Sequence, residues 1–164
     1  SDLIYGNQGT DTLFGGQEAD TMFGGQDADV IYGNLAADVI YGNLGADLLY
    51  GGQDADILYG GQQADTLFGN SGNDTLFGNL GADRFQFGSG SGADTIGDFS
   101  SAQGDVIAVA INANGTGVAS ATDLLTRLTT DTSGNALLDL GSGNSITLIG
   151  VPPASLSAGD LELV

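Results

Sequence analysis

The sequence predicts an all-β solenoid with 18 residues in each coil, closed at its C-terminal end by a β-rich cap. Two observations predict this fold. An aspartate occurs at every ninth residue through half of the chain, and large apolar residues follow it in the same phase. A period this strict is the signature of repeats that stack on one another. The aspartates are Asp2, Asp11, Asp20, Asp29, Asp38, Asp47, Asp56, Asp65, Asp74 and Asp83.

Each repeat divides into a turn and a short strand. A glycine opens the turn, and a Gly or Asn follows it, because both tolerate the positive φ angles of tight turns. The three residues after most aspartates are apolar, aromatic or β-branched, so we expect a strand of three residues there. The opening glycines are Gly6, Gly15, Gly24, Gly33, Gly42, Gly51, Gly60, Gly69 and Gly78.

Alternation along each strand separates a core face from a solvent face. The middle residue is always large and apolar, so we expect these residues in the core: Ile4, Leu13, Met22, Ile31, Ile40, Leu49, Leu58, Leu67, Leu76 and Phe85. The last residue is aromatic from Tyr5 to Phe77 and should face outward. Such rows either stack between neighbouring coils or mark a surface for a partner or for sugar rings. Stacking is the simpler reading.

Two repeats are needed to close one coil, because a single repeat supplies only one turn and one strand. Aspartates 18 residues apart then form a ladder along each edge, from Asp2 to Asp74 and from Asp11 to Asp83. Stacked strands lie about 4.8 Å apart. Two carboxylates at this distance repel by about 1 kcal/mol in water and about 3 kcal/mol at an effective dielectric of about 20. We expect divalent cations between successive aspartates.

The composition excludes several classes of binding partner. The chain of 164 residues has a net charge of −19, no Cys, His, Lys or Trp, and only Arg84 and Arg127 as cationic side chains. It should therefore repel nucleic acid and anionic membranes, and no apolar run is long enough for membrane insertion. High charge with 29 glycines is typical of disorder, but the apolar residues are phased. We expect a chain that orders once its carboxylates are neutralised.

The available ligands are carboxylate and backbone carbonyl oxygens, which favour Ca²⁺ over Zn²⁺ or Cu²⁺, and over Mg²⁺ with its rigid octahedral shell. Each ladder of five aspartates has four gaps, so about eight Ca²⁺ ions would fill them. These ions bring about +16 and reduce the net charge from −19 to about −3.

These residues resemble the RTX family, the haemolysin-type calcium-binding nonapeptides of pattern G-G-x-G-x-D-x-U-x. The resemblance implies a right-handed parallel β-roll with Ca²⁺ in its turns. It implies that the ten aspartates and the carbonyls of the turns opened by Gly6 to Gly78 bind the metal. It also implies export from a Gram-negative bacterium by a type I secretion machine, and folding in extracellular calcium. The missing turn before Asp2 suggests a piece of a longer array.

The chain departs from the family pattern at the fourth repeat position. Glycine is retained as Gly9, Gly45, Gly72 and Gly81, and it is replaced by Glu18, Asp27, Ala36, Asp54 and Gln63. A non-glycine residue at positive φ costs about 1–2 kcal/mol, so we expect strained turns or weaker calcium binding there. The replacing carboxylates are expected to be solvated rather than metal ligands.

The period ends near residue 87, so we expect a calcium-binding roll over residues 1–87 and a cap over residues 88–164. Asp94 and Asp98 either bind a last ion or cap turns. We expect strands at residues 106–111, 136–140, 145–149 and 161–164, and a short helix over 124–128 whose N-cap is Thr122 or Asp123. The tail resembles the uncleaved secretion signal of type I substrates.

The sequence supports two functions and disfavours a third. The first is a calcium-responsive folding and secretion module of a larger exported protein. The second is a structural or adhesive element of a cell-surface assembly, in which the outward aromatics bind a glycan or another copy. The third, an enzyme, is disfavoured because a chain without His, Cys or Lys cannot build the usual nucleophile–base pairs. In the family, a catalytic protease, lipase or epimerase region lies upstream.

Overall fold

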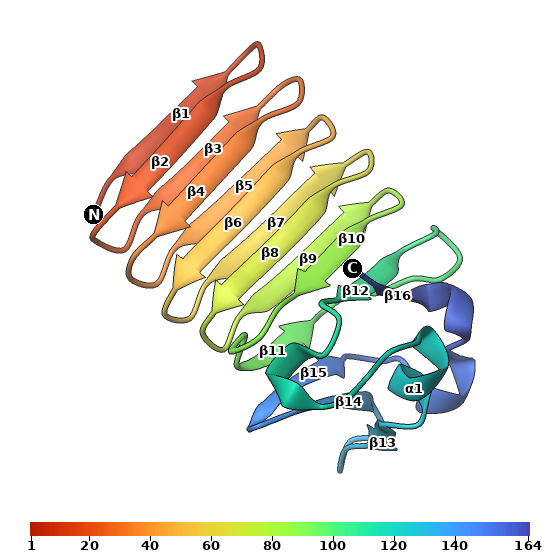
Figure 1. Cartoon of the computed structure of the whole chain (residues 1–164). Coiled ribbons are helices and arrows are strands. Elements are labelled where there is room, and N and C mark those ends of the chain that lie inside the picture. The colour runs from red at the N-terminus through yellow and green to blue at the C-terminus, as the bar shows by residue number, and fades with distance from the viewer.

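The computed structural model describes residues 1–164 as a coil whose strands alternate between two sheets (Figure 1). One sheet has the order β1 (Leu3–Asn7), β3 (Thr21–Gly25), β5 (Val39–Leu44), β7 (Ile57–Gln62), β9 (Thr75–Leu80), β11 (Ala93–Ile96), β15 (Asn144–Leu148), β14 (Ala136–Gly141) and β13 (Leu128–Thr130). The other has the order β16 (Leu161–Leu163), β12 (Val106–Val109), β10 (Arg84–Phe87), β8 (Thr66–Ser71), β6 (Leu48–Gln53), β4 (Val30–Asn34) and β2 (Thr12–Gly16). The predicted parallel β-roll is confirmed.

The strand register follows from the repeat length. Ile40 pairs with Leu58, and Ile31 pairs with Leu49, so residues 18 positions apart lie side by side in parallel strands. Every repeat position therefore forms a straight row along the roll. The predicted coil of two nine-residue repeats is confirmed.

The strands are longer than the sequence predicts. The repeat strands contain five or six residues, because pairing continues through the first turn residues. Asn34 pairs with Gly52, and Asn43 pairs with Gly61, in register with the apolar residues before them. The glycines that open the turns thus lie inside strands and face inward.

The predicted core column lies between the two sheets. Its members from Met22 to Phe85 are fully buried, whereas Ile4 and Leu13 are only partly buried at the N-terminal end of the roll. Alternate residues face outward, as the period of a strand requires. Burying each such side chain contributes about 1.5–3 kcal/mol, so the column is the main apolar contribution to stability.

The outward aromatics form two stacked rows. The ring centroids of Tyr32 and Tyr50 lie 4.8 Å apart with 4° between the ring planes, and those of Tyr41 and Tyr59 have the same values. The stacking reading of the sequence is therefore realised. Each aromatic pair contributes about 0.5–1.5 kcal/mol beyond its buried area. Because neighbouring ring faces engage each other, they are less available for stacking on sugars.

The cap extends both sheets and lies at one end of the roll (Figure 1). β15 pairs with β11 in parallel, β14 and β13 follow as antiparallel strands, and β16 pairs with β12. One buried cluster continues from Met22 to Leu161, so the cap covers the roll's core. The division into two domains at residue 87 remains a prediction.

Two details of the cap differ from the sequence prediction. The helix α1 (Ala121–Leu125) begins after Ser120, whose side chain accepts a hydrogen bond from the Asp123 N–H, so Ser120 is the N-cap. Leu128, expected at the end of this helix, opens β13 instead.

Short 3₁₀ turns occupy Ala113–Gly115, Pro153–Ser155 and Ala158–Asp160. No helix has the length and apolar character that a membrane span requires.

Candidate metal centre

Two aspartate ladders run along the opposite edges of the roll, as the sequence predicts. In each ladder, the backbone N–H of one aspartate donates to Oδ1 of the aspartate one coil further along. Asp29 N lies 2.8 Å from Asp47 Oδ1, and Asp47 N lies 2.8 Å from Asp65 Oδ1. One oxygen of each carboxylate is therefore committed to joining neighbouring coils.

The second carboxylate oxygen has no partner in the protein. Oδ2 is buried and without a hydrogen bond in Asp11, Asp29, Asp38, Asp47, Asp56, Asp65, Asp74, Asp83 and Asp94. A buried polar atom without a partner costs about 1–3 kcal/mol, and more when the group is charged. Such atoms recurring in nearly every turn indicate that something outside the protein satisfies them.

The fixed glycines make room for these oxygens. A Cβ atom on Gly42 would lie 2.4 Å from Asp47 Oδ2 and 2.4 Å from the carbonyl oxygen of Gly60 in the next coil. The space beside the glycine is therefore enclosed by a carboxylate and a carbonyl oxygen. An equivalent pair, one aspartate Oδ2 and one glycine carbonyl oxygen, faces each of Gly6, Gly15, Gly24, Gly33, Gly51 and Gly60. Gly69 and Gly78 face the carboxylates of Asp74 and Asp83.

The opening glycines do not have the positive φ that the sequence analysis expects of them. None of the nine has a positive φ, so their role is to allow a close approach rather than a left-handed turn. Positive φ angles occur at the next position, as in Asn43 at 77° and Gly52 at 123°.

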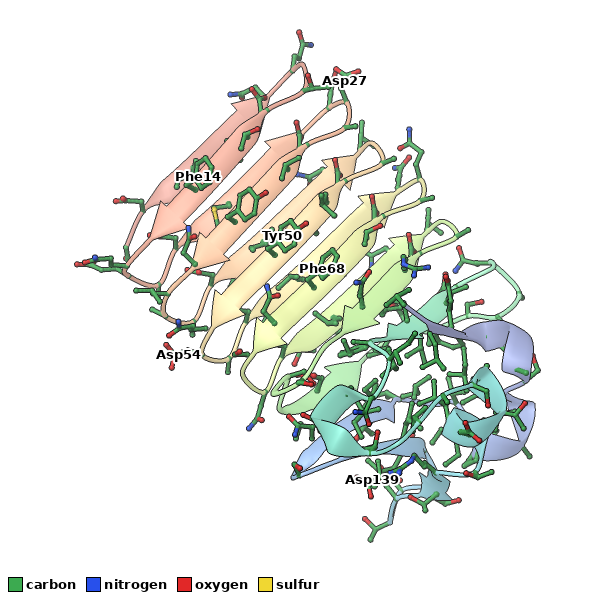
Figure 2. The ribbon with its side chains drawn as sticks, viewed as in Figure 1. Phe14, Asp27, Tyr50, Asp54, Phe68 and Asp139 are labelled. Carbon is green, nitrogen blue, oxygen red and sulfur yellow. The ribbon has the colours of Figure 1, made fainter.

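Four of the five replaced fourth positions have the left-handed backbone for which strain is expected. Asp27, Ala36, Asp54 and Gln63 have φ angles of 71–74°, whereas Glu18 is not in the left-handed region. Asp27 and Asp54 are exposed at opposite edges of the roll (Figure 2). Asp27 is not simply solvated, because its Oδ2 accepts a hydrogen bond from Gly9 N at 3.1 Å. Gln63 makes the equivalent bond to Gly45 N at 3.0 Å.

The two ladders end differently. Asp94 extends one ladder, since Asp74 N donates to its Oδ1 at 3.0 Å and its Oδ2 is buried without a partner. Asp98 lies outside both ladders, and its two oxygens accept hydrogen bonds from Gly78 N, Asn79 N and the Asn79 side chain. These bonds match the turn-capping alternative for Asp98.

Asp105 is the ladder residue that the sequence interpretation missed. It occupies the place after Asp83, whose N–H donates to Asp105 Oδ1 at 3.0 Å, but Asp105 Oδ2 accepts from Ser100 N. The interval of 22 residues hides it from a nine-residue period. The motif Asp105-Val106-Ile107, an aspartate followed by a buried strand, was the available signal. At the other end, Asp2 is exposed and Asp11 is half-buried.

Burial perturbs the acidity of the ladders. It raises the pKa of Asp47 from 3.8 to about 6, that of Asp56 to about 7 and that of Asp65 to about 8, and charges on neighbouring aspartates add to the effect. Burial likewise raises the pKa of Asp94 to about 7. The ladder carboxylates therefore bind protons more readily in the folded roll than in the unfolded chain.

The donor set fits a hard cation. No group of three or more His, Cys, Asp or Glu side chains is placed to hold a metal ion, so an ion in these turns would need backbone carbonyls or water as further ligands. Carboxylate and carbonyl oxygens in turns are the ligands of Ca²⁺, which accepts six to eight oxygens in flexible geometry. The buried Oδ2 atoms and the glycine cradles thus provide places for such an ion.

The fold and these turns define a repeat protein whose turns are lined by buried carboxylate and carbonyl oxygens. The family model of the RTX calcium-binding nonapeptide repeat matches residues 1–22, 23–58, 32–67, 50–85 and 59–96. The chain therefore belongs to the RTX calcium-binding nonapeptide repeat family, and this membership implies calcium binding.

A solved structure shares this fold. The AlgE6R3 subunit of a mannuronan C5-epimerase from Azotobacter vinelandii is 26% identical, with 90% of this chain and 79% of that chain covered and a TM-score of 0.54. The extracellular lipase LipA from Serratia marcescens is 17% identical over 96% of this chain and 40% of that chain, with a TM-score of 0.45. No curated protein matches the sequence.

The raised pKa values predict opposite pH responses with and without calcium. In EDTA, the folded ladders bind protons more tightly than the unfolded chain, so this contribution to stability is present at low pH and lost as pH rises through about 6–8. The β signal in far-UV circular dichroism should therefore increase from about pH 8 to about pH 5. With calcium, acidification should instead raise the calcium midpoint, because ligands must be deprotonated. A pH-independent signal in EDTA would contradict the burial of these carboxylates.

Proposed function

We propose that the chain is a module that folds on binding calcium and so couples folding to arrival outside the cell. The observation that carries the proposal is the buried, unpartnered Oδ2 atom that recurs from Asp11 to Asp94. The proposed ligands are the ten periodic aspartates with Asp94, and the carbonyls of the turns opened by Gly6 to Gly78. Asp98 is left out because hydrogen bonds already occupy both of its oxygens. About eight ions are proposed for the four gaps among the five periodic aspartates of each ladder, and Asp94 adds a fifth gap to one of them.

Folding and calcium binding form one equilibrium in this proposal. Each site combines oxygens from two successive coils, such as Asp47 Oδ2 and Gly60 O, and these oxygens are not held together in an unfolded chain. A ligand that binds only the folded state stabilises it by RT ln(1 + [L]/Kd) at each site. Low calcium should thus leave a chain of net charge −19 unfolded, and high calcium should fold it.

We further propose type I secretion from a Gram-negative bacterium, with the C-terminal region read by the secretion machine. RTX repeat proteins are typically secreted. Here β16 is folded into the cap: Leu161 is buried, and β16 pairs with β12. A signal in this segment is therefore accessible only in the unfolded chain, which suits transport before calcium is met.

A structural role in a calcium-dependent surface assembly is the second candidate. The outward aromatics were its main support, but their rings stack on one another. Calcium-dependent oligomers in solution would favour it.

We propose no catalytic role for the chain, because its buried carboxylates are assigned to cations and it contains no His, Cys or Lys. Any catalytic activity is assigned to another part of a larger protein.

Two matched substitutions test the calcium proposal. Asp47→Asn removes a buried ladder charge, whereas Asp54→Asn removes an exposed charge at φ 72°, a conformation that Asn tolerates. Circular dichroism of each EDTA-treated variant is followed during titration with CaCl₂, with MgCl₂ as the control cation. We expect Asp47→Asn to raise the calcium midpoint several-fold and Asp54→Asn to leave it nearly unchanged, with little response to magnesium. Equal midpoints for the two variants would argue against the ladder sites.

A second test addresses secretion. The chain is produced in a Gram-negative host with a type I secretion machine. The amount of protein in the culture medium is then compared for the full chain, for a deletion of residues 145–164 and for Asp47→Asn. We expect the deletion to stay in the cell and Asp47→Asn to be exported, because transport requires the signal but not the fold. Equal export of the deletion and the full chain would refute the secretion role of the C-terminal region.

A further inference from the structure

A groove crosses the outer face of the seven-stranded sheet. It has a volume of about 650 Å³ and passes over strands β2, β4, β6 and β8. Tyr32 and Tyr50 form one side, Leu35 and Gln53 belong to the other, and Asn34 lies between them. The row of Phe14, Tyr50 and Phe68 that borders this face runs across the strands, along the roll (Figure 2). The groove therefore follows the roll axis.

The repeat generates the groove. A second groove of about 400 Å³ lies on the nine-stranded sheet and is lined by Tyr5, Phe23, Asn43 and Leu44, which occupy the same repeat positions. Each coil advances the groove by about 4.8 Å. A surface whose chemistry repeats at this interval suits a ligand that also repeats along its length.

Glycines hollow the floor at every second coil of the first groove. Gly16 and Gly52 alternate there with Asn34 and Asn70, so the pattern repeats about every 9.6 Å. A Cβ atom on Gly52 would lie 2.2 Å from the backbone oxygen of Asn34, so the backbone itself requires this glycine. The hollow is thus a fixed feature of the folded roll.

The groove offers hydrogen bonds but no charge. None of its lining residues is Asp, Glu, Lys or Arg. The Asn34 side-chain amide donates to the Tyr32 carbonyl at 3.2 Å, which orients the amide and leaves its Oδ1 as an acceptor. The hydroxyls of Tyr32 and Tyr50 are not buried and have no partner in the protein. The surface therefore offers one oriented acceptor, at Asn34, and the free hydroxyls of Tyr32 and Tyr50.

From this chemistry we infer that the groove binds a linear, uncharged polysaccharide. Extended glycans carry hydroxyls at each repeat, and these can pair with the Asn34 acceptor and with the hydroxyls of Tyr32 and Tyr50. Polyanions are disfavoured because no cationic side chain lines the groove. A peptide strand is disfavoured because it pairs with a sheet edge, and this groove lies on a sheet face. The sugar would contact ring edges and hydroxyls, since the ring faces stack on each other.

Affinity electrophoresis of the full chain in calcium tests the inference, with hydroxyethyl cellulose, glucomannan, dextran and alginate as the polymers in the gel. We expect retardation by an unbranched neutral polymer. Tyr50→Phe combined with Asn34→Ala should weaken it at least tenfold. Tyr59→Phe is the matched control, because this tyrosine stacks equally but lines neither groove.

The outcomes separate this inference from the proposed calcium function. Circular dichroism of the same samples reports folding. Calcium-dependent folding without retardation by any neutral polymer would overturn the groove and leave the calcium proposal intact. Retardation by alginate alone, or equal losses in Tyr59→Phe and the groove variant, would also overturn it. A chain that stays unfolded in calcium would contradict both, because the groove requires the folded roll.

Discussion

From Asp20 to Asp94, every half-coil of this roll buries a carboxylate, and the rest of the structure is arranged around it. One oxygen joins the coil to its neighbour through a backbone N–H, as Asp47 Oδ1 does with Asp29 N, and the other is left without a partner. Burying a charge costs several kcal/mol unless an opposite charge compensates it. With only two arginines in the chain, the protein cannot supply that charge itself. We therefore propose that the stability of the fold depends on cations or protons from solution.

The other repeat positions follow from the same constraint. Gly42 must lack a side chain because Asp47 Oδ2 and Gly60 O occupy the space that a Cβ would need. The next residue turns with positive φ, which explains the restriction of that position to Asn or Gly. The core column and the stacked aromatics then hold the coils in register. The proposed cations lie in the turns and the proposed glycan lies on a sheet face, so the two proposed sites do not share atoms.

Much of this could be predicted from sequence because one strict period fixes both the coil and its faces. Leu49 in the core, Tyr50 outside and Asp47 on the edge all follow from their positions in the repeat. Features that depend on contacts between coils could not be predicted. The hydrogen bond from Gly9 to Asp27, the close approach at Gly42 and the extension of strands into the turns require the neighbouring coil to be in place. Asp105 was missed because an insertion shifts it out of phase, although it holds a ladder position.

A bound cation for each buried Oδ2 can be sought in a crystal structure of the chain grown in calcium, with anomalous diffraction used to locate the ions. We expect anomalous peaks beside the inward glycines, with the ion about 2.3–2.6 Å from Oδ2 atoms such as that of Asp47 and from carbonyls such as that of Gly60. A well-ordered roll at high calcium without such peaks, with its ladder carboxylates protonated instead, would show that cations do not satisfy the buried oxygens.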